Sequence, residues 1–187
     1  RVAYVLGINT SEINNDYIEE QNGNLAKLTQ KLNIVSDTLV NTLGNSLSKN
    51  DIFTSFANTI NDRSTGNLFN IDNTNSISNI IKNVEADKNI TIDNNLKTNS
   101  AALISSVNKT IQNIDTTLFE NTVKNATRLA VANNNTTSES SFKSNISQES
   151  FDVSSSVTSI STASENIALT FSATQLYSEP PIIIQVP

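Results

Sequence analysis

The strongest pattern in the chain is a run of apolar residues that recur every three or four positions between residues 25 and 47. Such spacings place the side chains on one stripe of an α-helix, and the stripe must be buried against another surface. The stripe consists of Leu25, Leu28, Leu32, Val35, Leu39, Leu43 and Leu47. We expect either a core-facing helix of a bundle or one strand of an oligomeric coiled coil. In this register Lys31 is expected to face solvent, next to a buried Leu32.

Helical spacing returns in three regions that follow this stretch. Their apolar faces are Ile52, Phe53, Phe56, Ala57 and Ile60; then Ile77, Ile80, Ile81 and Val84; then Leu103, Ile104, Val107, Ile111, Ile114 and Leu118. Asp51 is a candidate N-cap, and Thr117 with Glu120 has the spacing of a capping box that would start another helix. The sequence therefore predicts a mainly helical region over residues 11–132.

After residue 132 the pattern changes to alternation of apolar and small polar residues. The alternating positions are Phe142, Ser144 and Ile146, then Phe151, Val153, Ser155 and Val157, then Ile167, Leu169 and Phe171. A period of two is typical of strands with one buried face. We therefore expect a linker over residues 133–140 and a β-rich region over residues 141–187.

The predicted fold class is α+β. An extended apolar strand in residues 1–10 precedes the helical bundle or coiled coil, and the β-rich unit follows it, with extended termini. A β-solenoid is the alternative, although the glycine-marked turns of that fold are missing. Residues 40–50 and 111–121 align at an offset of 71, which leaves open a duplication of one helical unit.

The last ten residues form a candidate docking arm. Pro180 and Pro181 restrict the backbone to extended conformations, so the arm is expected to leave the domain. Its apolar side chains, Ile182, Ile183, Ile184 and Val186, would lie on both faces of a strand. A neighbouring subunit could receive this strand, and pairing with residues 2–8 of the same chain is the alternative.

Composition excludes several kinds of chemistry. The chain has no Cys and no His, so it cannot supply a thiolate nucleophile, a Ser-His-Asp triad or the usual ligands of zinc. A calcium-loop spacing occurs at Asp87, Asn89, Thr91 and Asp93, but Ile92 occupies the position that requires glycine. We therefore predict no catalytic residue, no cofactor and no metal. Methionine is also absent, so Arg1 is expected to follow a processed or longer sequence.

The charge and polarity of the chain limit the kinds of partner that it can bind. The net charge is −6 without any cluster of Lys and Arg, which argues against nucleic acid, because phosphate binding requires dense basic charge. No run of about 20 apolar residues exists, and contact with a membrane stays open. About two-fifths of the residues are Asn, Ser or Thr, so neutral polar groups cover the surface.

Together these features favour a non-enzymatic structural subunit, in a virion as a capsid-associated protein or in an extracellular filament. Amphipathic helices that need partners and apolar termini are typical of such subunits. We expect protein partners, either as a homo-oligomer or as a subunit of a larger assembly. The alternative is a secreted or membrane-anchored surface interaction protein, such as an adhesin, a viral entry protein or a helical toxin.

Overall fold

The computed structural model describes residues 10–12, 16–44, 47–61 and 69–169. In these ranges the chain forms seven α-helices, one short 3-10 helix and no strand. The elements are η1 (Thr10–Glu12), α2 (Gly23–Leu43), α3 (Lys49–Asn61), α4 (Thr74–Lys88), α5 (Asn94–Gln112), α6 (Phe119–Ser138), α7 (Ser140–Ile146) and α8 (Val153–Glu165). The helical-bundle part of the prediction is confirmed, and the α+β class is wrong.

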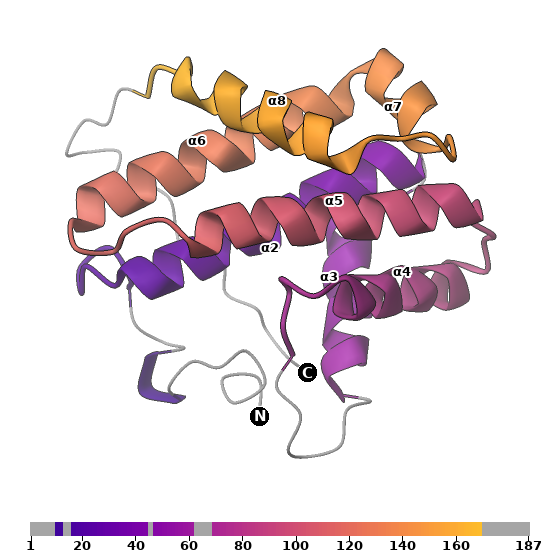
Figure 1. The fold of residues 1–187 in the computed structure, drawn as a ribbon. Helices are drawn as coiled ribbons and strands as arrows, with labels where there is room; N and C mark the ends of the chain where they lie inside the picture. The colour runs from indigo at the N-terminus through magenta and orange to yellow at the C-terminus, as the bar shows by residue number, and fades with distance from the viewer. Residues whose placement is uncertain (1–9, 13–15, 45–46, 62–68, 170–187) are drawn as a thin grey trace.

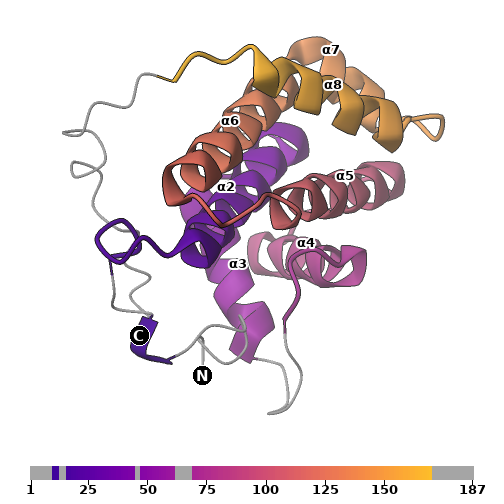
Figure 2. The same cartoon turned by 60° about the vertical axis from the view of Figure 1, so that its left-hand side comes forward.

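The helices form layers around α2. Helices α6 and α5 pack against α2, and α8 covers α6 and α5 from outside (Figure 1). Helices α3 and α4 pair with each other, and α3 runs steeply across the direction of α2. Figure 2 shows α7 and α8 together on the outer side of α6. The chain thus places its longest helix in the middle.

Asn and Asp side chains fix where four of the helices begin. The side chain of Asn22 accepts hydrogen bonds from the backbone N–H groups of Asn24 and Leu25 at the start of α2. Asn73, Asp93 and Asp152 cap α4, α5 and α8 in the same way. Asn and Asp are unfavourable inside helices but favourable at N-caps, because their oxygens satisfy free N–H groups. The abundance of Asn is therefore compatible with a helical fold.

The predicted stripe of α2 lies inside the bundle of the same chain. Leu25, Leu32, Val35, Leu39 and Leu47 are buried, whereas Leu28 and Leu43 are partly buried. Burial extends far beyond the stripe, because Asn24 is the only exposed residue among the 21 of α2. The core around it includes the fully buried side chains Ile77, Ile80, Ile81, Leu103, Ile104, Ile111, Ile146 and Ile160. The structure thus gives α2 the role of a central bundle helix.

The predicted β-rich region is helical as far as residue 165. Helix α6 continues to Ser138 through most of the predicted linker, and α7 and α8 follow. The error has a physical cause: positions four apart satisfy a period of two and also lie on one face of a helix. Phe142 and Ile146 of α7 are buried in this manner. Residues 1–9 of the predicted N-terminal strand and the whole docking arm lie outside the described residues, and Thr10 begins η1.

Two predicted caps are also wrong. Asp51 is not an N-cap but lies inside α3, where its Oδ2 accepts hydrogen bonds from the backbone N–H and the hydroxyl of Ser48. The backbone N–H of Asp51 donates to Ser48 Oγ in return, which makes a capping box. Thr117 and Glu120 form no such box, because Thr117 donates both its N–H and its hydroxyl to Asp115, and α6 has no side-chain cap.

The first residues of two helices follow the internal offset noted in the sequence. Helix α2 begins at Gly23 and α5 begins at Asn94, 71 positions later. The capping residues Asn22 and Asp93 are separated by the same distance along the chain. The spatial environments differ, because α2 is central whereas α5 lies nearer the surface (Figure 1). The two segments are therefore similar in local sequence and in where their helices begin, but not in where the helices end, at Leu43 and Gln112.

Candidate functional site

Polar side chains of α2 and the partners that they bind on other segments make up the candidate site. They form two groups, on the N-terminal and the C-terminal halves of the helix. We call the first group, Lys27, Lys31, Asp72 and Gln112, the lysine cluster. We call the second group, Thr38, Asn41, Asn133, Asn134 and Thr137, the amide cluster. Each cluster joins helices that are far apart in the sequence.

In the lysine cluster, two ammonium groups of α2 meet the end of α5 and the start of α4. Lys31 Nζ lies 2.9 Å from Asp72 Oδ2 and also donates to Gln112 Oε1. Lys27 Nζ donates to the backbone carbonyl of Gln112 at 2.9 Å. The two lysines are one turn apart and each is only 5% exposed. The prediction that Lys31 faces solvent is therefore wrong.

The environment of Lys27 changes its acidity. Burial lowers the pKa of the Lys27 ammonium, the neighbouring charge of Lys31 lowers it further, and the carboxylate of Asp115 raises it. A lysine with a lowered pKa is a recurring feature of Schiff-base enzymes. Here the ammonium is already bound to the last carbonyl of α5, which is a typical C-terminal capping interaction. The geometry favours a structural role for Lys27.

The segment before α4 is fastened to α5 by its backbone. Ser105 Oγ donates to the carbonyl of Asp72 at 2.6 Å, and Asn108 Nδ2 donates to the carbonyl of Ile71 at 2.8 Å. Asp72 Oδ1 and Asn108 Oδ1 are buried without a hydrogen-bond partner. Phe69 contacts Phe56 edge to face, with ring centroids 5.1 Å apart. These contacts hold the start of α4 against both α5 and α3.

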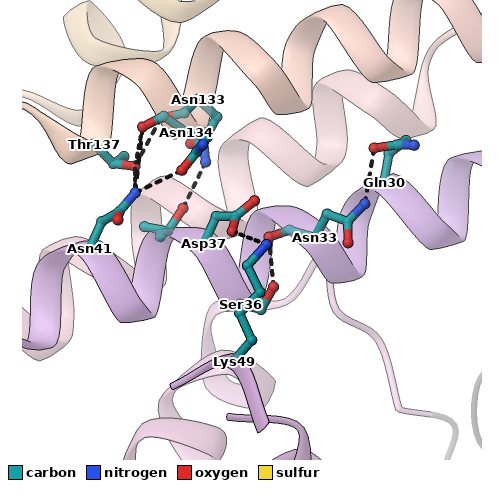
Figure 3. A network of polar contacts seen from close by, with 10 residues as sticks. Gln30, Asn33, Ser36, Asp37, Asn41, Lys49, Asn133, Asn134 and Thr137 are labelled. Carbon is teal, nitrogen blue, oxygen red and sulfur yellow. Dashed lines mark hydrogen bonds and ion pairs between the residues drawn. The ribbon is translucent and has the colours of Figure 1, made fainter. Parts of the chain in front are cut away.

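The amide cluster joins α2 to α6 (Figure 3). Asn133 is fully buried, and its Nδ2 donates to Thr38 Oγ1 at 2.9 Å. Asn41 Nδ2 donates to Asn134 Oδ1 and to Thr137 Oγ1, each at 3.0 Å. These bonds tie two successive turns of α2 to α6. Because each bond requires one alignment of the helices, the cluster fixes the register of this interface.

A more exposed row of polar side chains continues along α2 in Figure 3. Asn33 Nδ2 donates to Gln30 Oε1, and Asp37 pairs with Lys49 of α3 at 2.6 Å. The Lys49 side chain is 56% exposed. The side chains of this row bind one another within the chain.

The acidic side chains of α3 and α4 also bind within the protein. Asp87 accepts hydrogen bonds from Ser55 and Asn58 of α3, and Asp93 caps α5. The calcium-loop spacing therefore does not gather its oxygens around one point. In the described ranges there is no group of three acidic, His or Cys side chains that could hold a metal ion. These contacts join α3 to α4 and fix the start of α5.

The site that sequence reasoning predicted is only part of what the structure brings together. The apolar stripe lies on α2 from Leu25 to Leu43, whereas Leu47 is buried in the segment between α2 and α3. The arm residues Ile182, Ile183, Ile184 and Val186 lie outside the described residues. The lysine and amide clusters were missed. One signal could have indicated them: α2 carries only three charged residues in 21. So little charge is typical of a helix that is covered on most sides.

Comparisons with known proteins add no identity to this geometry. No protein-family model, curated protein or solved structure matches the chain. No helix in the described part of the chain is long and apolar enough to cross a bilayer.

Proposed function

We propose that this chain is a non-enzymatic structural subunit of a larger protein assembly. The proposal rests on the partners that lysine and carboxylate side chains have in the structure. Several of the lysines and carboxylates in the described residues bind partners on other helices or at helix ends, as Lys31 and Asp87 illustrate. Such an interior provides stiffness and a defined shape, which a building block requires.

The surface supports the same proposal. Neutral Asn, Ser and Thr dominate it, and the charged pairs that lie on it, such as Asp37 with Lys49, are bound within the chain. Leu118, at the turn between α5 and α6, is the one large apolar side chain that is exposed among the described residues. A scattered single apolar residue is normal for a protein surface. Assembly contacts would therefore involve polar faces or the predicted arm.

The predicted docking arm supplies a specific route to assembly. Residues 180–187 join a Pro-Pro pair to a run of β-branched apolar residues, a composition suited to strand addition on a neighbouring subunit. Within this proposal, a virion or an extracellular filament is the setting that we favour. Both settings use protein partners and require no cofactor.

The test compares the full chain with a variant that lacks residues 180–187. Light scattering over a range of concentrations would give the mass, and circular dichroism would give the helical content. We expect the full chain to form assemblies that grow with concentration, and the truncated chain to keep its helices but remain monomeric.

Two results would contradict the proposal. The full chain could remain a monomer at high concentration, which would remove the assembly role. Alternatively, the truncated chain could lose helical signal, which would show that the arm completes its own fold. A variant with Ile182→Ser and Ile184→Ser keeps the length of the arm and serves as the matched control for the loss of apolar contact.

A further inference from the structure

Asn22 and Gly23 form an Asn-Gly pair at the start of the central helix. No other glycine in the sequence follows an asparagine. Such a pair is prone to deamidation, because glycine has no side chain to hinder its backbone nitrogen and restricts the chain least. The pair is therefore a candidate for covalent modification, and it lies outside the lysine and amide clusters.

The fold requires both residues at these positions. Asn22 is the N-cap of α2, and Gly23 is the first residue of the helix and is buried. A Cβ atom at position 23 would lie 3.3 Å from Cβ and Cγ2 of Thr116 and 3.4 Å from Cγ2 of Thr122. These distances are shorter than ordinary contacts, so a side chain here would displace its neighbours. The close approach of the helix start to the turn before α6 thus depends on glycine.

Hydrogen bonds hold both polar atoms of the Asn22 side chain. Oδ1 accepts from the backbone N–H groups of Asn24 and Leu25 at 3.1 and 3.2 Å. Nδ2 donates to Glu12 Oε1 at 3.0 Å, which ties η1 to the start of α2. The backbone N–H of Asn22 donates to the carbonyl of Tyr17 at 2.9 Å. The carboxamide is therefore fixed in the cap by three bonds, and the main chain by a fourth.

The backbone of Asn22 also keeps the reacting atoms apart. Deamidation begins when the nitrogen of Gly23 attacks Cγ of Asn22 and closes a five-membered ring, so this nitrogen must lie on the same side of the Cα–C bond as Cβ. The ψ angle of Asn22 is 93°, which in an L-residue turns the next nitrogen almost directly away from Cβ. Because ψ is the one soft rotation between these atoms, the ring cannot close until Asn22 leaves its cap conformation.

We propose that Asn22 is a deamidation site that the N-terminal cap of α2 protects, and that it reacts when the start of this helix opens. In the open state the Gly23 nitrogen bonds to Cγ of Asn22, the Cγ–Nδ2 bond breaks, and ammonia leaves with the proton of the Gly23 N–H. Water then adds to either carbonyl of the cyclic imide and yields aspartate or isoaspartate. Helix ends are among the first parts of a protein to open.

Either product loosens the link between η1 and α2. Aspartate at position 22 can still accept from Asn24 and Leu25, but it cannot donate to Glu12 and instead places a second carboxylate beside it. Like charges at this distance repel. Isoaspartate routes the main chain through Cβ and Cγ, which adds one atom before Gly23 and disturbs its close approach to Thr116. The reaction is thus a one-way change that releases residues 10–12 from the central helix.

The test compares the parent chain in mildly alkaline buffer with and without guanidinium chloride. Tandem mass spectrometry would locate a gain of one mass unit at residue 22, and a methyltransferase assay would detect isoaspartate. In denaturant we expect Asn22 to react faster than Asn75 and Asn99, each of which precedes a serine. In the folded chain Asn22 should react at least about tenfold more slowly, because opening breaks the cap and exposes Gly23.

Two results of this comparison would overturn the proposal. Equal rates at residue 22 in the two solutions would show that the cap gives no protection. A residue 22 that stays unmodified in denaturant would show that the pair is not a deamidation site. Neither result depends on a variant that has to fold.

Variants of Glu12 then test the cap bond. Glu12→Ala should speed the reaction of the folded chain by about fivefold, the effect of one lost hydrogen bond. Glu12→Gln keeps an acceptor for Asn22 Nδ2 and should react at the rate of the parent chain. The matched control is Glu20→Ala, which removes an exposed carboxylate of the same segment. A Glu12→Ala chain that reacts no faster than the Glu20→Ala chain would overturn the role of the cap.

Discussion

Lys31 and Asp72 form a 2.9 Å ion pair across 41 positions of sequence, with the lysine side chain only 7% exposed. Gln112 at the end of α5 shares the same ammonium group. The pair thus connects α2, α5 and the segment that leads into α4. A buried ammonium requires such compensation, because its removal from water is costly.

The first prediction concerns the loss of this ammonium. Lys31→Met should lower the free energy of unfolding by about 2–3 kcal/mol, because it leaves the Asp72 carboxylate without its counter-charge. The 16% exposure of the Asp72 side chain keeps the loss below the value of a fully buried pair. Urea unfolding followed by circular dichroism would measure it.

The matched control for Lys31 is Lys49, which pairs with Asp37 on the surface. The Lys49 side chain is 56% exposed, so Lys49→Met should change the free energy of unfolding by less than about 1 kcal/mol. Equal losses in the two variants would show that Lys31 does not contribute through a buried charge.

The second prediction concerns the amide cluster. Asn133→Ala removes the hydrogen bond to Thr38 in a fully buried position, and we expect a loss of about 1–3 kcal/mol in the free energy of unfolding. Asn135→Ala, two positions further along α6 at an exposed site, should cost no more than about 0.5 kcal/mol.

A double variant tests whether Asn133 and Thr38 act together. Thr38→Val combined with Asn133→Leu replaces both polar groups by apolar ones, which should cost less than the sum of the single changes. Strict additivity would mean that the two side chains contribute independently, contrary to the 2.9 Å hydrogen bond between them.

The sequence predicted the helices whose apolar periodicity is regular. The face of α4, with Ile77, Ile80, Ile81 and Val84, is completely buried as its spacing requires. Helices α7 and α8 were assigned to strands because Ser separates their apolar residues at even intervals. Ile160 distinguishes the two patterns, since it lies seven positions after Val153 and fits a helix but not a strand.

The candidate site was harder to predict than the fold. The burial of Lys31 depends on Asp72, which belongs to a different part of the chain, and no local pattern encodes that approach. The same holds for Asn133 and Thr38, which are 95 positions apart. Periodicity identifies a buried face, whereas the polar partners on that face follow from tertiary packing.

The third prediction concerns pH. The ammonium of Lys88, together with the N–H and hydroxyl of Ser48, lowers the pKa of Asp51 from 3.8 to about 2. Because the pKa is lower in the folded state, the stabilisation is present above about pH 4 and is lost as the pH falls toward 2. NMR titration of the Asp51 carboxyl carbon would give the pKa directly.

Lys88→Ala should raise the pKa of Asp51 toward its ordinary value, since Lys88 is the largest cause of the shift. Lys82→Ala is the control, because Lys82 is exposed on the same helix and is not among the groups that shift this carboxyl. An Asp51 pKa that moves equally in both variants would point to the general charge of the surface rather than to the Lys88 contact.

The last prediction compares two leucines that sequence periodicity placed on apolar stripes. Leu39 is fully buried in the C-terminal half of α2, whereas Leu118 is 63% exposed because α5 ends at Gln112 and the turn carries it outward. Leu39→Ala should cost about 2–5 kcal/mol, through lost apolar contact and the cavity left among helices that cannot close around it. Leu118→Ala should change stability by no more than about 0.5 kcal/mol. Chemical denaturation of both variants would measure the difference, and a large loss at Leu118 would mean that another chain covers this side chain in solution.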